Sequence, residues 1–157
     1  MSSTKSLPIT DIQLSNMVFI KNDSDSNNYA TFIINTENWV QPESEDEIIK
    51  MTSFIANIAT NTLLKSQSRG FEKFNVIVYL EKFKVSQLNY KFIKYLADIL
   101  KALFPERLNK ATIIDPPRFF ISGYDVIKQF LDKPTRKKLQ LISTKENKQV
   151  YFDNIDD

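Results

Sequence analysis

The chain has 157 residues, of which 42% are hydrophobic and 25% charged, and this size and balance suit one globular domain with a single core. It contains no Cys, no His and only 2 Gly, which excludes disulfides, thiolate metal sites, histidine bases and glycine-rich phosphate loops. The net charge of +2 is too small to indicate nucleic-acid binding, and no apolar run is long enough to span a membrane. Since the first residues are polar and lack the apolar core of a signal peptide, we expect a cytoplasmic protein.

The amino-terminal part of the chain predicts a flexible arm followed by two short strands. Residues 1–13 are mostly polar, and we expect a loosely attached arm there. Apolar and β-branched residues at 17–20 and 30–34 predict strands, and the Asn, Asp and Ser residues at 22–28 predict the loop between them. A hairpin is the simplest connection for such a pair.

Two amphipathic helices flank a buried strand in the middle of the chain. Ser44 and Glu47 form a capping-box pattern at the start of a helix predicted over 44–66. The continuous apolar run at 74–80 predicts a strand that is buried on both faces. Apolar residues at helical spacing predict a second helix over 89–103.

The last part of the chain alternates again between strand and helix. A short strand is expected at 111–114, an apolar helix at 122–131 and a strand at 138–142. Strand, helix and strand together form the crossover unit of an α/β sheet. We therefore predict an α/β fold, a mostly parallel mixed sheet of about five strands with helices packed on it, formed by residues 14–143 and followed by a charged tail at 144–157.

A series of short motifs from residue 104 onward resembles one known family. In chain order they are an aromatic-Pro-Glu-Arg turn, a hydrophobic strand, an Asp-Pro-Pro break, a Phe-Phe and a Phe-Leu pair, and a Thr-x-x-Lys: Phe104-Pro105-Glu106-Arg107, 111–114, Asp115-Pro116-Pro117, Phe119-Phe120, Phe130-Leu131 and Thr135-Arg136-Lys137-Lys138. Their order and spacing resemble the CRAL-TRIO lipid-binding domain of the yeast-type phosphatidylinositol transfer proteins and the α-tocopherol transfer protein. The strand at 74–80 and Ser86 continue the likeness, whereas Tyr79 and Lys82 replace the Asp and Gly that are usual in the family.

The resemblance implies a non-catalytic protein that holds one phospholipid in an apolar cavity and exchanges it between membranes. Phosphatidylinositol or a phosphoinositide is the expected ligand, with no metal and no other cofactor. Each buried CH₂ of an acyl chain contributes roughly 0.8 kcal/mol, so a dry cavity lowers the barrier for a lipid that leaves a bilayer. The family's headgroup residues match Glu106, Thr135 and Lys138, and Ser86 is a further candidate. The ammonium of Lys138 and the hydroxyl of Thr135 suit a phosphodiester, and the carboxylate of Glu106 suits inositol hydroxyls.

The apolar helix is expected to act as the gate of that cavity. It carries apolar residues on more than one face, although a core helix needs only one such stripe; the gate residues are Phe119, Phe120, Tyr124, Ile127, Phe130 and Leu131. Basic residues cluster beside it, between 128 and 148, so we expect transient peripheral contact with an anionic membrane surface. The helical domain that precedes this lobe in the family has no counterpart in the chain. We therefore expect a minimal lobe with exposed apolar surface, which would allow a homodimer.

Each headgroup candidate also has an ordinary structural role available to it. Lys138 could be a solvated lysine, and Thr135 could cap a turn. Glu106 could form an ion pair with the neighbouring Arg107, and Ser86 could cap a helix.

Two other classes of function stay open from the residues alone. The strand-then-helix rhythm from Phe74 to Leu103 also fits a STAS-type protein-interaction module, which holds no lipid. An enzyme that uses the paired carboxylates Glu81 and Asp115, at the ends of two strands, is the second alternative.

Overall fold

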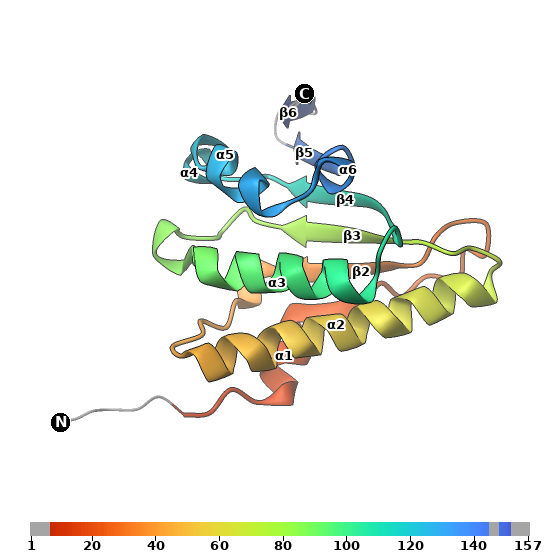
Figure 1. Cartoon of the computed structure of the whole chain (residues 1–157), viewed down its shortest axis with the longest axis horizontal. Coiled ribbons are helices and arrows are strands. Elements are labelled where there is room, and N and C mark those ends of the chain that lie inside the picture. Colours follow the sequence, from red (N-terminus) through yellow and green to blue (C-terminus); the bar gives the residue numbers. More distant parts are fainter. Residues whose placement is uncertain (1–6, 145–147, 152–157) are drawn as a thin grey trace.

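The computed structural model describes residues 7–144 and 148–151. Six strands form one sheet in chain order: β1 (Val18–Ile20), β2 (Thr31–Asn35), β3 (Phe74–Tyr79), β4 (Leu108–Ile114), β5 (Leu139–Ser143) and β6 (Lys148–Tyr151) (Figure 1). Strands β2 to β5 are parallel to one another, whereas β1 and β6 pair antiparallel at the two sides of the sheet. The predicted α/β fold with a mostly parallel mixed sheet is therefore confirmed.

The helices connect these strands. They are α1 (Asp11–Met17), α2 (Glu45–Ser68), α3 (Tyr90–Leu103), α4 (Arg118–Ser122), α5 (Tyr124–Ile127) and α6 (Lys133–Arg136), with short 3₁₀ turns η1 (Thr36–Asn38), η2 (Val85–Gln87) and η3 (Lys128–Phe130). Within the described part of the chain, none of them is long and apolar enough to cross a bilayer.

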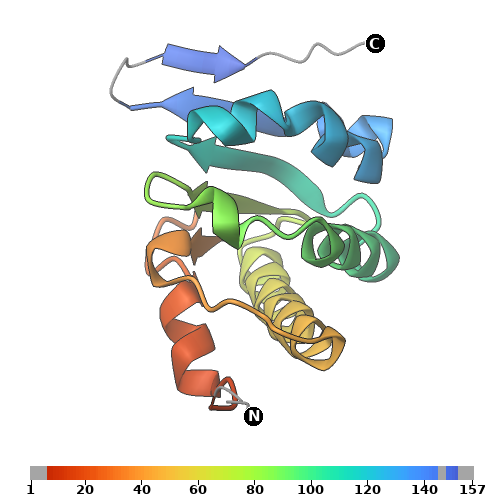
Figure 2. The ribbon, with the colours of Figure 1, turned by 90° about the vertical axis from the view of Figure 1, so that its left-hand side faces the viewer.

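The three crossovers lie on the same face of the sheet. Because β2 to β5 follow one another in sequence order and parallel crossovers are right-handed, α2, α3 and the connection at 118–136 all pack on one side. Figure 2 shows these helices together beside the sheet. The connection at 118–136 contains α4, α5, η3 and α6, and it is called segment 118–136 below. This topology also places the starts of β2 to β5 at one end of the sheet, the amino edge, and their ends at the other, the carboxyl edge.

Helix α2 shows how the sequence determines this layer. The Ser44 side chain accepts a hydrogen bond from the Glu47 amide at 3.2 Å, as the capping pattern predicts. The Glu47 carboxylate accepts from the Glu43 amide at 2.7 Å rather than from the Ser44 amide. The buried side of the helix includes Met51 and Ile55, which are almost completely enclosed.

The buried side chains form two adjoining clusters. The amino-terminal core joins α1, α2 and the strands β1 to β3 and includes Leu14, Phe32 and Met51. The carboxyl-terminal core joins β4, β5 and segment 118–136; its members are Leu80, Phe83, Ile113, Phe120, Tyr124, Ile127 and Leu141. Trp39 connects the two, because its ring meets Phe83 and Phe92 edge-on at centroid distances of 5.4 and 5.2 Å.

The expectation of a loosely attached arm at 1–13 is wrong for its last residues, which the structure describes. Thr10 caps α1 through a reciprocal bond with Gln13, and Ile9 is buried. The Lys50 ammonium donates to the Ile9 carbonyl and fastens this stretch to α2. Helix α1 also replaces the first residue of the strand expected at 17–20. Residues 1–6 of the expected arm lie outside the described residues.

The single apolar helix expected over 122–131 is also wrong. Pro117 starts α4 earlier, and the α-helical turns are interrupted at Gly123 and end at Ile127. A 3₁₀ turn follows, after which Leu131 is extended and Asp132 caps the separate helix α6. Segment 118–136 is therefore a chain of short turns. Residues 148–151, expected within the charged tail, form β6 and pair with β5.

Candidate lipid headgroup site

Three of the four predicted headgroup residues share the amino edge. Glu106 lies in the connection from α3 to β4, Thr135 lies in α6, and Lys138 directly precedes β5 (Figure 1). Ser86 lies in η2, after β3, and hence at the carboxyl edge, at the opposite end of the sheet. Its alternative role as a helix cap is wrong, because Asn89 caps α3 and accepts from the Phe92 amide at 3.0 Å.

Glu106 has an unusual backbone conformation. Its φ is 61°, in the left-handed region that costs a residue with a side chain on the order of 1–3 kcal/mol. Its side chain is exposed, and among the described residues its carboxylate has no hydrogen-bond or ion-pair partner. A strained, unpaired carboxylate in a turn is a candidate for binding a ligand.

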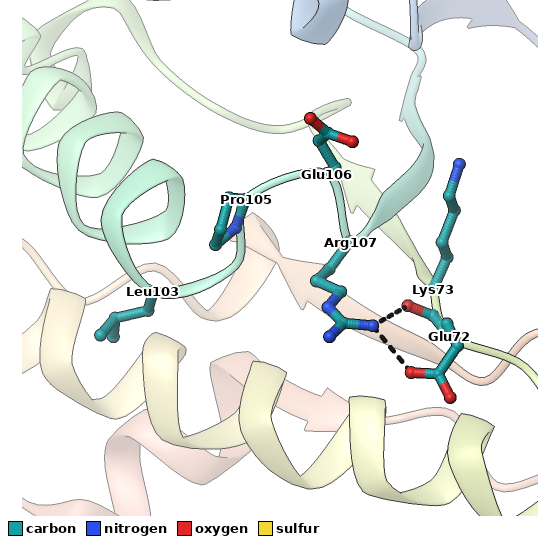
Figure 3. A pocket seen from close by; sticks show the side chains of 6 residues that line it. All are labelled: Glu72, Lys73, Leu103, Pro105, Glu106 and Arg107. Carbon is teal, nitrogen blue, oxygen red and sulfur yellow. Dashed lines mark hydrogen bonds and ion pairs between the residues drawn. The ribbon is translucent and has the colours of Figure 1, made fainter.

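The alternative ion pair between Glu106 and Arg107 is not formed. Arg107 instead donates to the Glu72 carboxylate at 2.7 Å and to the Glu72 carbonyl at 3.2 Å. Figure 3 shows the Glu106 carboxylate pointing away from this pair. The hydrogen bond from Gln67, together with the Arg107 guanidinium, lowers the pKa of Glu72.

A hollow at the amino edge contains Glu106. Its lining is formed by the start of β3 and the turn after α3: Glu72, Lys73, Leu103, Pro105, Glu106 and Arg107 (Figure 3). The Lys73 ammonium extends on the same side as the Glu106 carboxylate. The hollow therefore offers both an acceptor and a cation to a polar ligand.

Asp132 caps the turn that contains Thr135 and leads to Lys138. The Asp132 carboxylate accepts from the Thr135 amide at 2.9 Å, and the Lys138 amide donates to the Thr135 carbonyl at 3.0 Å. Hydrogen bonds from the Thr135 side chain and amide lower the pKa of Asp132, with Lys101 and Lys138 contributing. The cap of this turn is therefore Asp132, and Thr135 contributes the amide that is capped. The same turn holds Lys138 at the start of β5.

The amino edge is rich in cations. Lys133, Arg136 and Lys137 project from α6 and its end, and in the part of the chain that the structure describes none of them has an ion-pair partner. Lys101, at the end of α3, lies 3.9 Å from Asp132. An anionic group at this edge would therefore meet several positive charges.

The six predicted gate residues divide into two sets. Phe120, Tyr124 and Ile127 are buried in the carboxyl-terminal core. Their half-buried neighbours lie further out: Phe119 faces Phe83, Phe130 faces Tyr90, both at a centroid distance of 6.4 Å, and Leu131 precedes α6. The inner three thus fill the space between segment 118–136 and the sheet, and the outer three stay accessible at its surface.

The structure also gives roles to residues that the sequence interpretation did not single out. Tyr90 and Lys101 contact segment 118–136 from α3, through Phe130 and Asp132. Neither residue belongs to a sequence motif, and both occupy regular positions on a helix. Their contacts with the segment can be found only from the packing of α3 in the structure.

The paired carboxylates of the enzyme alternative are at the carboxyl edge. Asp115, with φ 54°, accepts from the Thr144 amide at 2.7 Å and from the Thr144 hydroxyl at 2.6 Å. These bonds fasten the end of β4 to the end of β5, which is a structural role. In the described ranges no three acidic residues gather as a metal site would require.

Comparison with known proteins identifies the family. A family model described as "CRAL/TRIO domain" matches residues 14–156. The Sec14 cytosolic factor of Schizosaccharomyces pombe (strain 972 / ATCC 24843) is 34% identical over 55 residues, which is 35% of this chain and 19% of that protein. The crystal structure of Sfh5 has the same fold, with a TM-score of 0.64 and 19% identity over 87% of this chain and 50% of that chain. The chain thus spans half or less of these relatives. Because the family model covers nearly all of it, the chain belongs to the CRAL/TRIO family of lipid-binding domains.

Proposed function

We propose that this chain binds one phospholipid, phosphatidylinositol or a phosphoinositide, and exchanges it between membranes without catalysing a reaction. The observation that carries the proposal is that Glu106, Thr135 and Lys138 lie at the same edge of the sheet, beside a segment with half-exposed apolar residues. A headgroup site next to an apolar layer suits an amphipathic ligand.

The headgroup would lie at the amino edge. The Lys138 ammonium pairs with the phosphodiester, and the unpaired cations of α6 accept any further phosphate on the inositol ring. Glu106 accepts hydrogen bonds from inositol hydroxyls. The strain at Glu106 supports this role, because no partner among residues 7–144 and 148–151 explains why this carboxylate stands in a left-handed turn.

The acyl chains would enter the carboxyl-terminal core. Phe120, Tyr124 and Ile127 fill that space in the closed form, so the lipid displaces segment 118–136 outward as it enters. Several short turns bend apart more readily than one continuous helix, because fewer helical hydrogen bonds span the breaks. The segment's construction therefore supports a gate.

Docking to a membrane would use the outer surface of the same segment. Val126 is 42% exposed there, and Lys133, Arg136 and Lys137 lie near it in the chain. Each cation contributes on the order of 1 kcal/mol at an anionic surface. We propose a transient, peripheral contact with the cytoplasmic face of membranes.

Extraction and mass spectrometry of lipid that co-purifies with the protein is the first test. Lys138→Ala should then reduce transfer of phosphatidylinositol between vesicles by about tenfold or more, the factor expected when a charge-assisted hydrogen bond is lost. Lys137→Ala removes the same charge from the neighbouring exposed residue and should have a much smaller effect. Equal effects of the two variants would show that Lys138 acts only through general charge.

The STAS-type alternative and the homodimer are two further expectations from the sequence. The family match leaves the STAS-type alternative without support. The homodimer stays a prediction, and sedimentation equilibrium tests it: a monomer at high micromolar concentration would contradict it.

A further inference from the structure

Helix α3 faces segment 118–136 along one stripe. Tyr90, Ile93 and Lys101 lie on this stripe, because eleven residues make close to three full turns and span about 16 Å. Ile93 packs against the carboxyl-terminal core, and Lys101 approaches Asp132 at 3.9 Å. Tyr90, at the first turn of α3, also contacts the segment.

Tyr90 touches the segment at two points. Its ring meets Phe130 at a centroid distance of 6.4 Å and an angle of 61°. Its hydroxyl oxygen lies against Gly123, so closely that a Cβ on residue 123 would be 3.1 Å from that oxygen. The same Cβ would be 3.3 Å from the Phe119 carbonyl oxygen.

The lack of space for a side chain therefore explains why residue 123 is glycine. Its φ of −88° is one that any residue adopts, so the backbone conformation does not demand glycine. It sits at the break between α4 and α5, where the end of the Tyr90 side chain occupies the place of its missing side chain. A hydrogen atom fits there, and a methyl group would force one of its neighbours to move.

We propose that Tyr90, whose hydroxyl contacts Gly123 and whose ring packs edge-on against Phe130, is a latch that holds segment 118–136 closed and sets how often it opens. The proposal rests on the proposed function in taking the segment as the gate of a lipid site. It adds a residue outside the gate that controls the motion. Tyr90 is a positioning residue, since it acts through the segment.

The test measures opening without any lipid. Hydrogen exchange of the amides of Gly123, Val126, Ile127 and Leu131 reports on the segment, because these amides bond within it. Tyr90→Ala should speed their exchange roughly three- to tenfold, the factor expected from losing one aromatic pair. The matched control is Tyr95→Ala, on the same helix, whose hydroxyl bonds Glu45 of α2 and not the segment. It should leave these amides unchanged.

A double-mutant cycle separates the latch from a general packing defect. Gly123→Ala alone should also speed exchange, because the new methyl group displaces the Tyr90 hydroxyl. Combined with Tyr90→Ala it should add little, since the group it displaced is gone. Additive effects would show that Gly123 serves the Phe119 backbone contact, and unchanged exchange in Tyr90→Ala would show that there is no latch.

Lipid exchange gives the second readout. With phosphatidylcholine vesicles that carry pyrene-labelled phosphatidylinositol, the Tyr90→Ala protein should pick up and release probe faster than wild type by a factor similar to the change in amide exchange. If wild type transfers no probe while the amide result holds, the latch stands and the proposed ligand fails. If transfer occurs and neither readout responds to Tyr90→Ala, the latch is wrong and the proposed function is unaffected.

Discussion

The amino-terminal and carboxyl-terminal cores share one sheet but are packed differently. In the first, a capped helix of 24 residues lies across β1 to β3, and Leu14, Phe32 and Met51 have no exposed surface. In the second, segment 118–136 contains no α-helix longer than 5 residues, and half of the predicted gate residues are only half buried. Both residues with side chains in left-handed conformations, Glu106 and Asp115, are found among the described residues on the carboxyl-terminal side. The difference is consistent with the proposed gate, in which the amino-terminal core is the support and segment 118–136 is the layer that moves.

The comparison predicts its largest effect for side-chain removal in the amino-terminal core. Met51→Ala removes a fully buried side chain from a region with no room to collapse, and should lower the free energy of unfolding by about 2–5 kcal/mol. Phe130→Ala removes a larger but half-buried side chain from segment 118–136 and should cost less. Urea unfolding of both variants checks this order, and the reverse order would end the distinction between the two cores.

An ion pair on the amino-terminal side should give the next largest effect. The Arg69 guanidinium lies 2.5 Å from Asp23 and also donates to the Asn28 carbonyl at 3.0 Å, with only 7% of its side chain exposed. Arg69→Met should destabilise the protein by about 1.5–3 kcal/mol, since these bonds involve charged groups. Lys82→Met breaks the exposed pair with Glu37 and should cost about 0.5 kcal/mol or less.

The same ion pair predicts a pH dependence. The hydrogen bond from Arg69 lowers the pKa of Asp23 in the folded protein, whereas the unfolded value is about 3.9. The unfolded state thus binds more protons in this range, so the stabilisation is complete above about pH 5 and is lost as the pH falls through the folded pKa. Arg69→Met should therefore flatten the loss of stability between neutral and acid pH. An unchanged acid transition in this variant would contradict the assignment.

A smaller effect than that of Arg69→Met is expected on the carboxyl-terminal side, at the cap of α6. Asp132→Ala removes the acceptor of the Thr135 amide and should cost about 1 kcal/mol. Asp125→Ala, which removes an exposed carboxylate from the same segment, is the control and should be nearly neutral. If Asp132→Ala leaves stability unchanged but alters lipid transfer, the turn serves the headgroup site rather than the fold.

The sequence predicted strands β1 to β5 because they are short apolar runs, rich in β-branched residues. The capping pattern at Ser44 and Glu47 also marked the start of α2 correctly, because such signals are local. Helix α1 was missed because a single buried turn, with Leu14 and Met17, carries too little periodicity over seven residues. The contact that leaves no room for a side chain at residue 123 could not be foreseen, because the Tyr90 hydroxyl lies on another helix.

The candidate site was predictable only in part. The motif spacing brought Glu106, Thr135 and Lys138 to one edge of the sheet, since parallel strands begin together. The same spacing could not show that Ser86 follows β3 at the opposite edge. Nor could it show that Arg107 would pair with Glu72 and leave Glu106 free, because Glu72 is 35 residues away in the chain.

The order of the strands has a consequence for how the chain folds. Each of β2 to β5 pairs with the strand that follows it in sequence, so every crossover can add to a sheet that already exists. During synthesis, α1, β1, β2, α2 and β3 emerge before segment 118–136, and they contain most of the amino-terminal core. Segment 118–136 arrives later, and the core that it covers is complete only when Leu141 of β5 has followed it. Folding from the ribosome would thus proceed from the amino-terminal core to the carboxyl-terminal core, and the part proposed to open in function is among the last to pack.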